Sequence, residues 1–134
     1  MLQNKIVVRY LDGRIIKGFT SDFMPNKDFL HLLPLGVSPN SKLQHINVPD
    51  IKAVFFVKDF QGNPQYQEKK EFEPSKPIMW RKIKVIFKDG ELLIGTTQSY
   101  YPGRSGFFVF PADSMSNNNR CYVVSSATKG VWLI

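Results

Sequence analysis

One phrase of the sequence occurs twice. Residues 8–20 read VRYLDGRIIKGFT, and residues 85–97 read VIFKDGELLIGTT, 77 residues further on. Laying residues 5–57 on 82–134 without a gap gives twelve identities, against about three expected from ordinary composition. The matching is poor only between residues 35 and 48. Because an internal repeat makes each copy a structural unit, we expect two similar halves.

Each copy opens with a strand pattern. Apolar residues recur at every second position, which is the period of a β-strand with one buried face. The positions that are apolar in both copies predict the core, and the alternate positions vary in character, as an outer face does. The predicted core positions of these first strands are Ile6, Val8, Tyr10, Ile83, Val85 and Phe87.

Glycines then mark the turns and a bend. Asp12-Gly13 and Asp89-Gly90 are the dipeptides typical of a type I′ hairpin turn. Gly18 and Gly95 lie inside the next predicted strand, where a glycine indicates a bend or bulge. Pro25-Asn26 and Pro102-Gly103 fit the centre of a type II turn.

These signals predict an all-β chain of two tandem five-stranded small barrels of the Sm-like or SH3-like kind. The predicted boundaries are residues 1–58 for the first barrel, 59–81 for a connecting segment and 82–134 for the second barrel. Only NPQYQEKKEF, residues 63–72, could form a short helix. The runs VFFV, FFVF and VWLI are apolar at consecutive positions, so both of their faces need cover. We expect the other barrel, packed across a pseudo-two-fold axis, or a neighbouring chain to supply it.

The stretch VVRYLDGRIIKGFTSDFMPN resembles the first motif of the Sm-like (Hfq/LSm-type) family. That motif carries an alternating strand, an Asp-Gly turn, a glycine in the bent strand and an Asp-x-x-x-Asn pair, which Asp22 and Asn26 match. The second copy departs from it with Ser99 and Gly103, and neither half has the second RNA-binding motif of the family. The whole chain also resembles an uncharacterised bacterial family of tandem small-barrel proteins. The Sm-like resemblance implies RNA as a ligand.

Charge and cysteine content suggest a compartment and a class of partner. The net charge is +7, from 18 basic and 11 acidic residues. A basic surface favours polyanions, nucleic acid before anionic membrane, although it can also serve solubility alone. Cys121 is the only cysteine, so no internal disulfide can form and a reduced compartment is favoured. With no apolar segment of signal-peptide or membrane-spanning length, we expect a cytoplasmic protein with no membrane partner.

Two turn loops, residues 23–27 and residues 100–104, are the best candidate site. Each combines aromatic side chains, a proline turn and a cation, and this combination can stack bases while neutralising phosphates. Trp80 and Arg81 form a further aromatic and basic cluster before the second copy. Alternatively, the aromatics could only cap the barrels and clamp the connecting segment. The candidate nucleic-acid-binding residues are Phe23, Asn26, Lys27, Tyr100, Tyr101, Arg104, Trp80 and Arg81.

Catalytic chemistry finds little support in the sequence. His31 and His45 have no cysteine or carboxylate at ligand spacing, so we expect no metal site. The chain lacks a nucleophile elbow, a phosphate-binding loop and a dinucleotide fingerprint, and no histidine stands beside Cys121. We therefore expect neither enzymatic activity nor a cofactor.

Two function classes remain. The first is a non-catalytic module that binds single-stranded RNA or another nucleic acid through the paired loops. The alternative is a protein-interaction adaptor that uses a sheet edge and the apolar strand faces, without nucleic acid. A bilobed monomer or a homodimer needs fewer assumptions than a ring of tandem barrels.

Overall fold

The structure is a computed structural model that describes residues 3–74, 80–98 and 100–134; Ser99 of the motif comparison lies outside them. It is all-β, as predicted, with two single 3-10 turns, η1 (Val48–Asp50) and η2 (Ser125–Ala127). No helix among the described residues is long and apolar enough to cross a membrane. The strands are β1 (Asn4–Arg9), β2 (Ile15–Thr20), β3 (Phe29–Pro34), β4 (Gln44–Asn47), β5 (Ala53–Val57), β6 (Arg81–Phe87), β7 (Leu92–Thr97), β8 (Gly106–Pro111), β9 (Asn118–Val124) and β10 (Thr128–Leu133).

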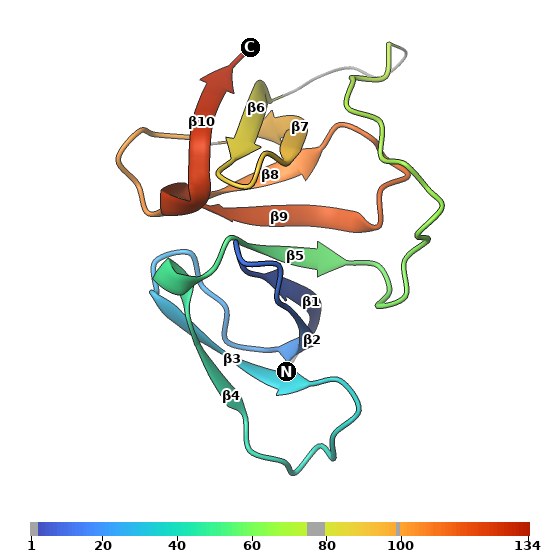
Figure 1. The fold of residues 1–134 in the computed structure, drawn as a ribbon, viewed down its shortest axis with the longest axis vertical. Coiled ribbons are helices and arrows are strands. Elements are labelled where there is room, and N and C mark those ends of the chain that lie inside the picture. Colours follow the sequence, from blue (N-terminus) through green and yellow to red (C-terminus); the bar gives the residue numbers. More distant parts are fainter. Residues whose placement is uncertain (1–2, 75–79, 99) are drawn as a thin grey trace.

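All ten strands belong to one antiparallel sheet with the order β10-β6-β7-β8-β9-β5-β1-β2-β3-β4 (Figure 1). The first half, β1–β5, and the second half, β6–β10, occupy separate ends of the molecule. Within each half the neighbours follow the same order. Their registers also agree, since Ile6 lies opposite Phe56 and Ile83 lies opposite Leu133, each 77 residues later.

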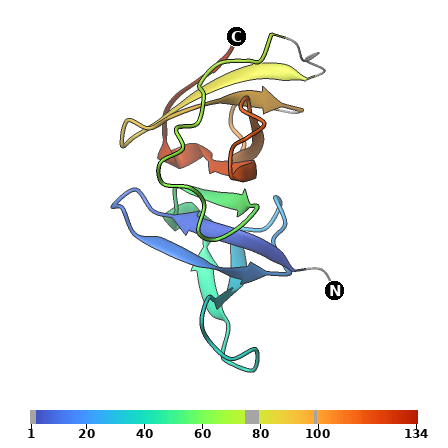
Figure 2. The ribbon, with the colours of Figure 1, turned by 90° about the vertical axis from the view of Figure 1, so that its right-hand side faces the viewer.

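The halves meet at a seam, which we define as the pairing of β5 with β9. Val54 lies opposite Tyr122 and Phe55 opposite Cys121. The last strand of one half therefore joins the fourth strand of the other, and the sheet continues across the junction (Figures 1 and 2). The predicted pseudo-two-fold packing is wrong, because a two-fold axis would pair like strands. The apolar run VFFV, residues 54–57, is instead covered by β9, the fourth strand of the other half.

The Asp-Gly hairpins are confirmed, but their turn type is not. Gly13 and Gly90 have φ of +94° and +93°, whereas no described residue other than glycine has a positive φ. A type I′ turn needs positive φ at both central residues. The N–H of Gly13 donates to the Tyr10 carbonyl at 3.1 Å, and the N–H of Tyr10 donates to the Arg14 carbonyl at 3.0 Å. This pattern fits a type I turn followed by a glycine bulge.

The strand glycines allow close contact between neighbouring strands. A Cβ added to Gly18 would lie 2.2 Å from the Leu33 carbonyl oxygen, and one added to Gly95 would lie 2.1 Å from that of Phe110. Both distances are far below van der Waals contact. Each glycine therefore lets the second strand of its half cross tightly against the third, while its pairing with the first strand runs without a register shift.

Five of the six predicted core positions, Ile6, Val8, Ile83, Val85 and Phe87, are fully inaccessible, whereas Tyr10 follows β1 and is only partly buried. The described part of the connector, residues 58–74 and 80, runs along the side of the molecule past both halves (Figures 1 and 2). The predicted helix in residues 63–72 is wrong, because this stretch has one turn and otherwise extended or irregular backbone. Side chains of this stretch contact the second half, as Tyr66 does at Asp113 and Glu68 at Ser116, and these contacts hold the backbone out of a helix.

Candidate functional site

Aromatic side chains from both halves interlock on one face of the seam. The Phe23 ring packs edge-on against Phe56 at 5.5 Å and against Tyr122 at 5.0 Å between ring centroids. The Arg120 guanidinium lies 4.3 Å from the Phe56 ring centroid and 4.7 Å from that of Phe108. Partial burial lowers the pKa of Arg120. These contacts make the seam a packed interface in addition to a row of backbone hydrogen bonds.

A buried lysine crosses the seam as well. Lys52, only 4% exposed, precedes β5 and extends into the hairpin turn between β6 and β7. Its Nζ donates to the Asp89 carboxylate at 2.7 Å and also to Glu91. The hydrogen bond from Lys52 is the main cause that lowers the pKa of Asp89. The ion pairs therefore fix the second half at a set position on the first.

The first predicted loop is divided between packing and exposure. Phe23 belongs to the aromatic face of the seam, and the Tyr122 hydroxyl donates to the Pro25 carbonyl at 3.3 Å. Asn26 and Lys27 are exposed. The turn is not type II, because φ of Asn26 is not positive. This loop thus supports the seam on one side and shows two polar side chains to solvent on the other.

The second predicted loop keeps more of its surface open. Tyr100 packs edge-on against Phe107, with 4.8 Å between the ring centroids. Tyr101 is 56% exposed, and the Arg104 guanidinium lies 4.7 Å from its ring centroid. Gly103 has φ of +91°, as a type II turn requires. Among the described residues, no hydrogen bond or ring contact joins this loop to the first one.

Trp80 and Arg81 lie apart from both loops. The Trp80 ring packs on Phe110 of β8, with 4.7 Å between centroids, and 40% of the residue is exposed. Arg81 opens β6, so the strand begins one residue earlier than predicted, and it is exposed. The tryptophan therefore attaches the end of the connector to the second half and still leaves part of its ring accessible.

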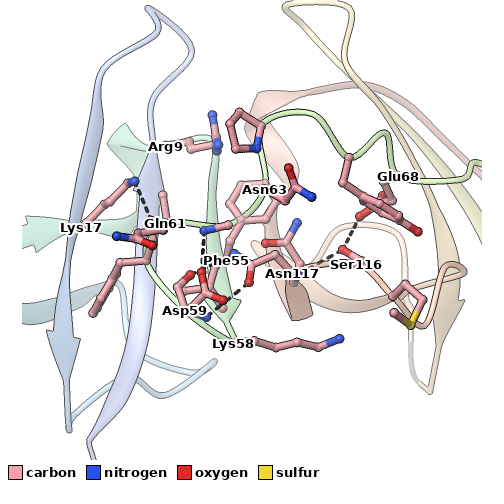
Figure 3. A pocket seen from close by; sticks show the side chains of 18 of the residues that line it. Arg9, Lys17, Phe55, Lys58, Asp59, Gln61, Asn63, Glu68, Ser116 and Asn117 are labelled. Carbon is pink, nitrogen blue, oxygen red and sulfur yellow. Dashed lines mark hydrogen bonds between the residues drawn. The ribbon is translucent and has the colours of Figure 1, made fainter.

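A hollow of about 770 Å³ lies between the halves on the side covered by the connector (Figure 3). Val7 and Phe55 contribute apolar surface to it, and the Arg9 guanidinium lies 5.5 Å from the Phe55 ring centroid. Two further lining cations are already bound. Lys17 Nζ donates to the Phe60 carbonyl at 2.8 Å, and Lys58 Nζ donates to the Ser114 carbonyl at 3.1 Å. These two lysines tie the connector to the first half and to the loop of residues 112–117 between β8 and β9.

Asp113 holds the middle of the connector. Its buried carboxylate accepts hydrogen bonds from the Tyr66 hydroxyl and from the Lys69 N–H, the latter at 2.8 Å. Although burial alone would raise it, the pKa of Asp113 is lowered by the Lys69, Tyr66 and Met115 donors. The same hydrogen bond raises the pKa of Tyr66 to about 12. The connector is thus fastened to the second half by a charged acceptor.

Sequence reasoning missed a polar cluster on β3 and β4. The His31 Nδ1 lies 2.7 Å from the Asp22 carboxylate, and its Nε2 lies 3.3 Å from Nδ1 of His45. The available signal was the strand register, which places the two histidines opposite each other. Donors from His31 and Thr20 lower the pKa of Asp22 against the opposing effect of partial burial. No group of three or more possible metal ligands occurs among the described residues.

Exposed apolar side chains occur in the outermost strand β10 and directly before the other outermost strand, β4, whose own apolar residue, Ile46, is buried. Trp132, Leu133 and Ile134 at the end of β10 are 48%, 37% and 60% exposed. Leu43, directly before β4, is 51% exposed. An edge strand with unpaired backbone groups and exposed apolar residues can add a further strand. The open edges therefore have the chemistry of an interaction surface.

Residues 2–134 match DUF6982, a family of unknown function, and the chain belongs to this family. No curated protein and no solved structure matches the chain.

Proposed function

We propose that this DUF6982 protein is a non-catalytic protein-interaction module whose open sheet edges take up a strand from a partner. In this proposal the two halves are tandem small barrels of one design. The registers that recur 77 residues apart support this. We place the module in the cytoplasm, because its only cysteine, Cys121, is a buried free thiol and the chain can form no internal disulfide.

The observation that carries the proposal is the contrast between paired and open edges. At the seam, Phe55 and Phe56 are each 4% exposed. Their counterparts on β10, Trp132 and Leu133, are 48% and 37% exposed. The seam is an example of strand addition between two such edges, and it buries large side chains along with the backbone groups. An added strand at β10 would bury the remaining pair in the same way.

A short peptide tests this function directly. The β10 edge corresponds to β5, whose seam partner is β9, so a peptide of residues 117–125 with Cys121→Ala should bind at β10. We expect saturable binding by fluorescence anisotropy, with a dissociation constant on the order of micromolar. Leu133→Lys should weaken it about tenfold or more. In the seam register Leu133 faces Arg120 of the peptide, as Phe56 does in the protein, and two cations would then lie opposite each other.

The matched control is the same peptide N-methylated at alternate residues on its pairing edge. It keeps every side chain but cannot donate the ladder hydrogen bonds. Equal binding of both peptides, or no saturable binding by the unmodified one, would refute strand addition as the mode of interaction.

Single-stranded nucleic acid is the second candidate, favoured by the Tyr101 and Arg104 pair. An exposed ring beside a guanidinium offers a stacking surface and a positive charge at one place. Lys27 and Asn26 in the counterpart loop are also exposed. Phe23 supports the first loop from within the seam, so we leave it out of this proposed surface.

This second candidate predicts binding of random-sequence single-stranded RNA that weakens as salt is raised. The double variant Lys27→Glu and Arg104→Glu lowers the net charge from +7 to +3. The matched control, Lys5→Glu with Lys88→Glu, makes the same charge change at exposed positions outside both loops. We expect about a tenfold or larger loss of affinity for the loop variant only. Equal losses would indicate a diffuse charge effect and no site in the loops.

A further inference from the structure

The seam is directional. It joins the last strand of the first half to the fourth strand of the second half, and so uses two different surfaces. The second half repeats the strand order of the first. Its own last strand, β10, is therefore left open, and so is β4, the fourth strand of the first half. An interface of unlike surfaces that leaves one copy of each open can be repeated indefinitely.

We propose that the partner of these edges is a second copy of this chain, with β10 of one copy pairing antiparallel with β4 of the next. This inference rests on the proposed function and names its partner. The seam fixes the register through the 77-residue correspondence. It places Val131 opposite His45, Trp132 opposite Gln44, and Leu133 opposite Leu43. Because β10 and β4 lie at opposite ends of the molecule, a chain cannot pair the two edges within itself (Figure 1).

The side chains at the two edges suit this pairing. Leu133 and Leu43 take the places of Phe56 and Arg120, which stack on each other at the seam. Both leucines are exposed in the single chain, at 37% and 51%. Facing one another, they would remove each other's apolar surface from water, which is favourable in proportion to the area buried. Their exposure is therefore explained by a missing neighbour of the same kind.

The aromatic face also has counterparts. Tyr100 in the second half corresponds to Phe23 in the first half. In the proposed pairing Tyr100 would approach His45 of the next chain, and His45 is the counterpart of Tyr122. At the seam, Phe23 meets both Tyr122 and Phe108. On β3 and β4 the equivalent rings are His31 and His45, whose centroids lie 5.1 Å apart. A ring on one side again meets two rings on the other.

The charges make the junction between chains weaker than the seam. The counterpart of Lys52 is Lys129, which would reach the turn that contains Asp12 and Arg14. At the seam the corresponding residues are both acidic, Asp89 and Glu91. The attraction between Lys52 and Glu91 is therefore replaced by a repulsion between Lys129 and Arg14. We infer an association that is reversible and dependent on concentration, whereas the seam is permanent.

Cysteine cross-linking tests both the partner and the register. In a Cys121→Ala background, Gln44→Cys chains are mixed with Trp132→Cys chains and oxidised. We expect one cross-linked product of about twice the 15.4 kDa of the chain. The control mixes His45→Cys with Trp132→Cys, a slip of one residue that puts the thiols on opposite faces. Its yield should be lower by about tenfold or more, because the geometry of a disulfide is strict.

A charge exchange provides the second measurement. Leu133→Lys and Leu43→Glu, each made at an exposed position, should both lower the average mass measured by light scattering toward that of one chain. Mixing the two variants should restore association and raise the average mass again. At one junction the introduced lysine faces the introduced glutamate, and at the alternate junction the unmodified Leu133 and Leu43 face each other. A chain that stays monomeric at all concentrations, or equal cross-linking in both registers, overturns this inference. Binding of the 117–125 peptide in the same preparations would then leave the strand-addition function standing with a different partner.

Discussion

Lys52 and Lys129 occupy the same place in the two halves, 77 residues apart, yet their surroundings differ. Lys52 is 4% exposed and bonded to two carboxylates of the other half, while Lys129 is exposed. Phe56 and its counterpart Leu133 differ in the same way, since Phe56 is 4% exposed and Leu133 is 37% exposed. Local sequence sets the strand and its register in both cases. Whether a residue is buried depends on whether a neighbouring edge is present, so matched substitutions in the two halves can separate these effects.

The largest difference should come from Phe56→Ala against Leu133→Ala. Phe56 is 4% exposed at the seam, so its truncation should lower the free energy of unfolding by about 3–5 kcal/mol. Leu133→Ala should lower it by about 1 kcal/mol or less at low protein concentration, because the residue is already partly in water. Urea denaturation followed by fluorescence measures both. Similar losses would show that the two edges are equivalent in the single chain.

Substitution of the two strand glycines, Gly18 and Gly95, should lower the free energy of unfolding equally in the two halves. Gly18→Ala and Gly95→Ala each force a Cβ within 2.2 and 2.1 Å of a carbonyl oxygen. Each should lower the free energy of unfolding by about 3 kcal/mol, since the paired strand has to shift. Gly13→Ala and Gly90→Ala are the matched pair for a purely conformational cost, because nothing lies within 4 Å of either position. A large inequality between Gly18→Ala and Gly95→Ala would break the structural correspondence itself.

Lys52→Ala should lower the free energy of unfolding by about 2 kcal/mol, less than the loss of a fully buried ion pair, because Asp89 and Glu91 are partly exposed. Lys129→Ala should change it by less than about 0.5 kcal/mol. The pKa of Asp89 is lowered in the folded state, mainly by Lys52. Its contribution is therefore present above the ordinary carboxyl pKa of about 3.9 and is lost as pH falls through the lower folded value.

The pH dependence supplies the control for this pair. The difference in stability between Lys52→Ala and the unmodified chain should narrow in acid, below about pH 4. A difference that stays constant down to the acid transition would show that Lys52 acts by packing and that its charge is unimportant.

The smallest effect concerns the connector, which binds the second half through Asp113. The corresponding position in the first half is Gly36, which is exposed and offers no such acceptor. Asp113→Asn should lower the free energy of unfolding by about 1 kcal/mol, through weaker acceptance of the Tyr66 and Lys69 donors. Tyr66, whose pKa is raised to about 12 in the intact protein, should titrate closer to 10 in the variant. Ultraviolet absorbance of the phenolate measures this shift. An unchanged titration would mean that Tyr66 is not bonded to Asp113 in solution.

Much of the fold follows from the sequence for local reasons. The period of two identifies the strands that start with Ile6 and Ile83, and the Asp-Gly dipeptides identify their hairpins. The turn type was wrong because an Asp-Gly pair also fits a type I turn with a glycine bulge, and only backbone angles separate the two. The connector helix was wrong because long-range contacts such as Tyr66 with Asp113 outweigh local propensity.

The candidate site was less predictable. Phe23 and its counterpart Tyr100 are both aromatic residues before a proline turn. Phe23 packs against Tyr122 across the seam, whereas Tyr100 packs against Phe107 of its own half. Their difference arises from the arrangement of the halves, which no pattern within one copy encodes. The same is true of Phe55 and Trp132. The histidine pair on β3 and β4 depends on register across a region where the two copies match poorly.

The connector changes the physical chemistry of the seam. Because residues 58–80 join the halves covalently, the seam closes in a unimolecular step, at an effective concentration that is on the order of millimolar for flexible links. It therefore stays formed however dilute the protein is. A junction of the same geometry between separate chains follows mass action, and its occupancy rises with the amount of protein in the cell. The same fold thus contains one strand pairing, the seam, whose occupancy does not depend on protein concentration. Its outer strands, β10 and β4, offer the surfaces for a second pairing whose occupancy does.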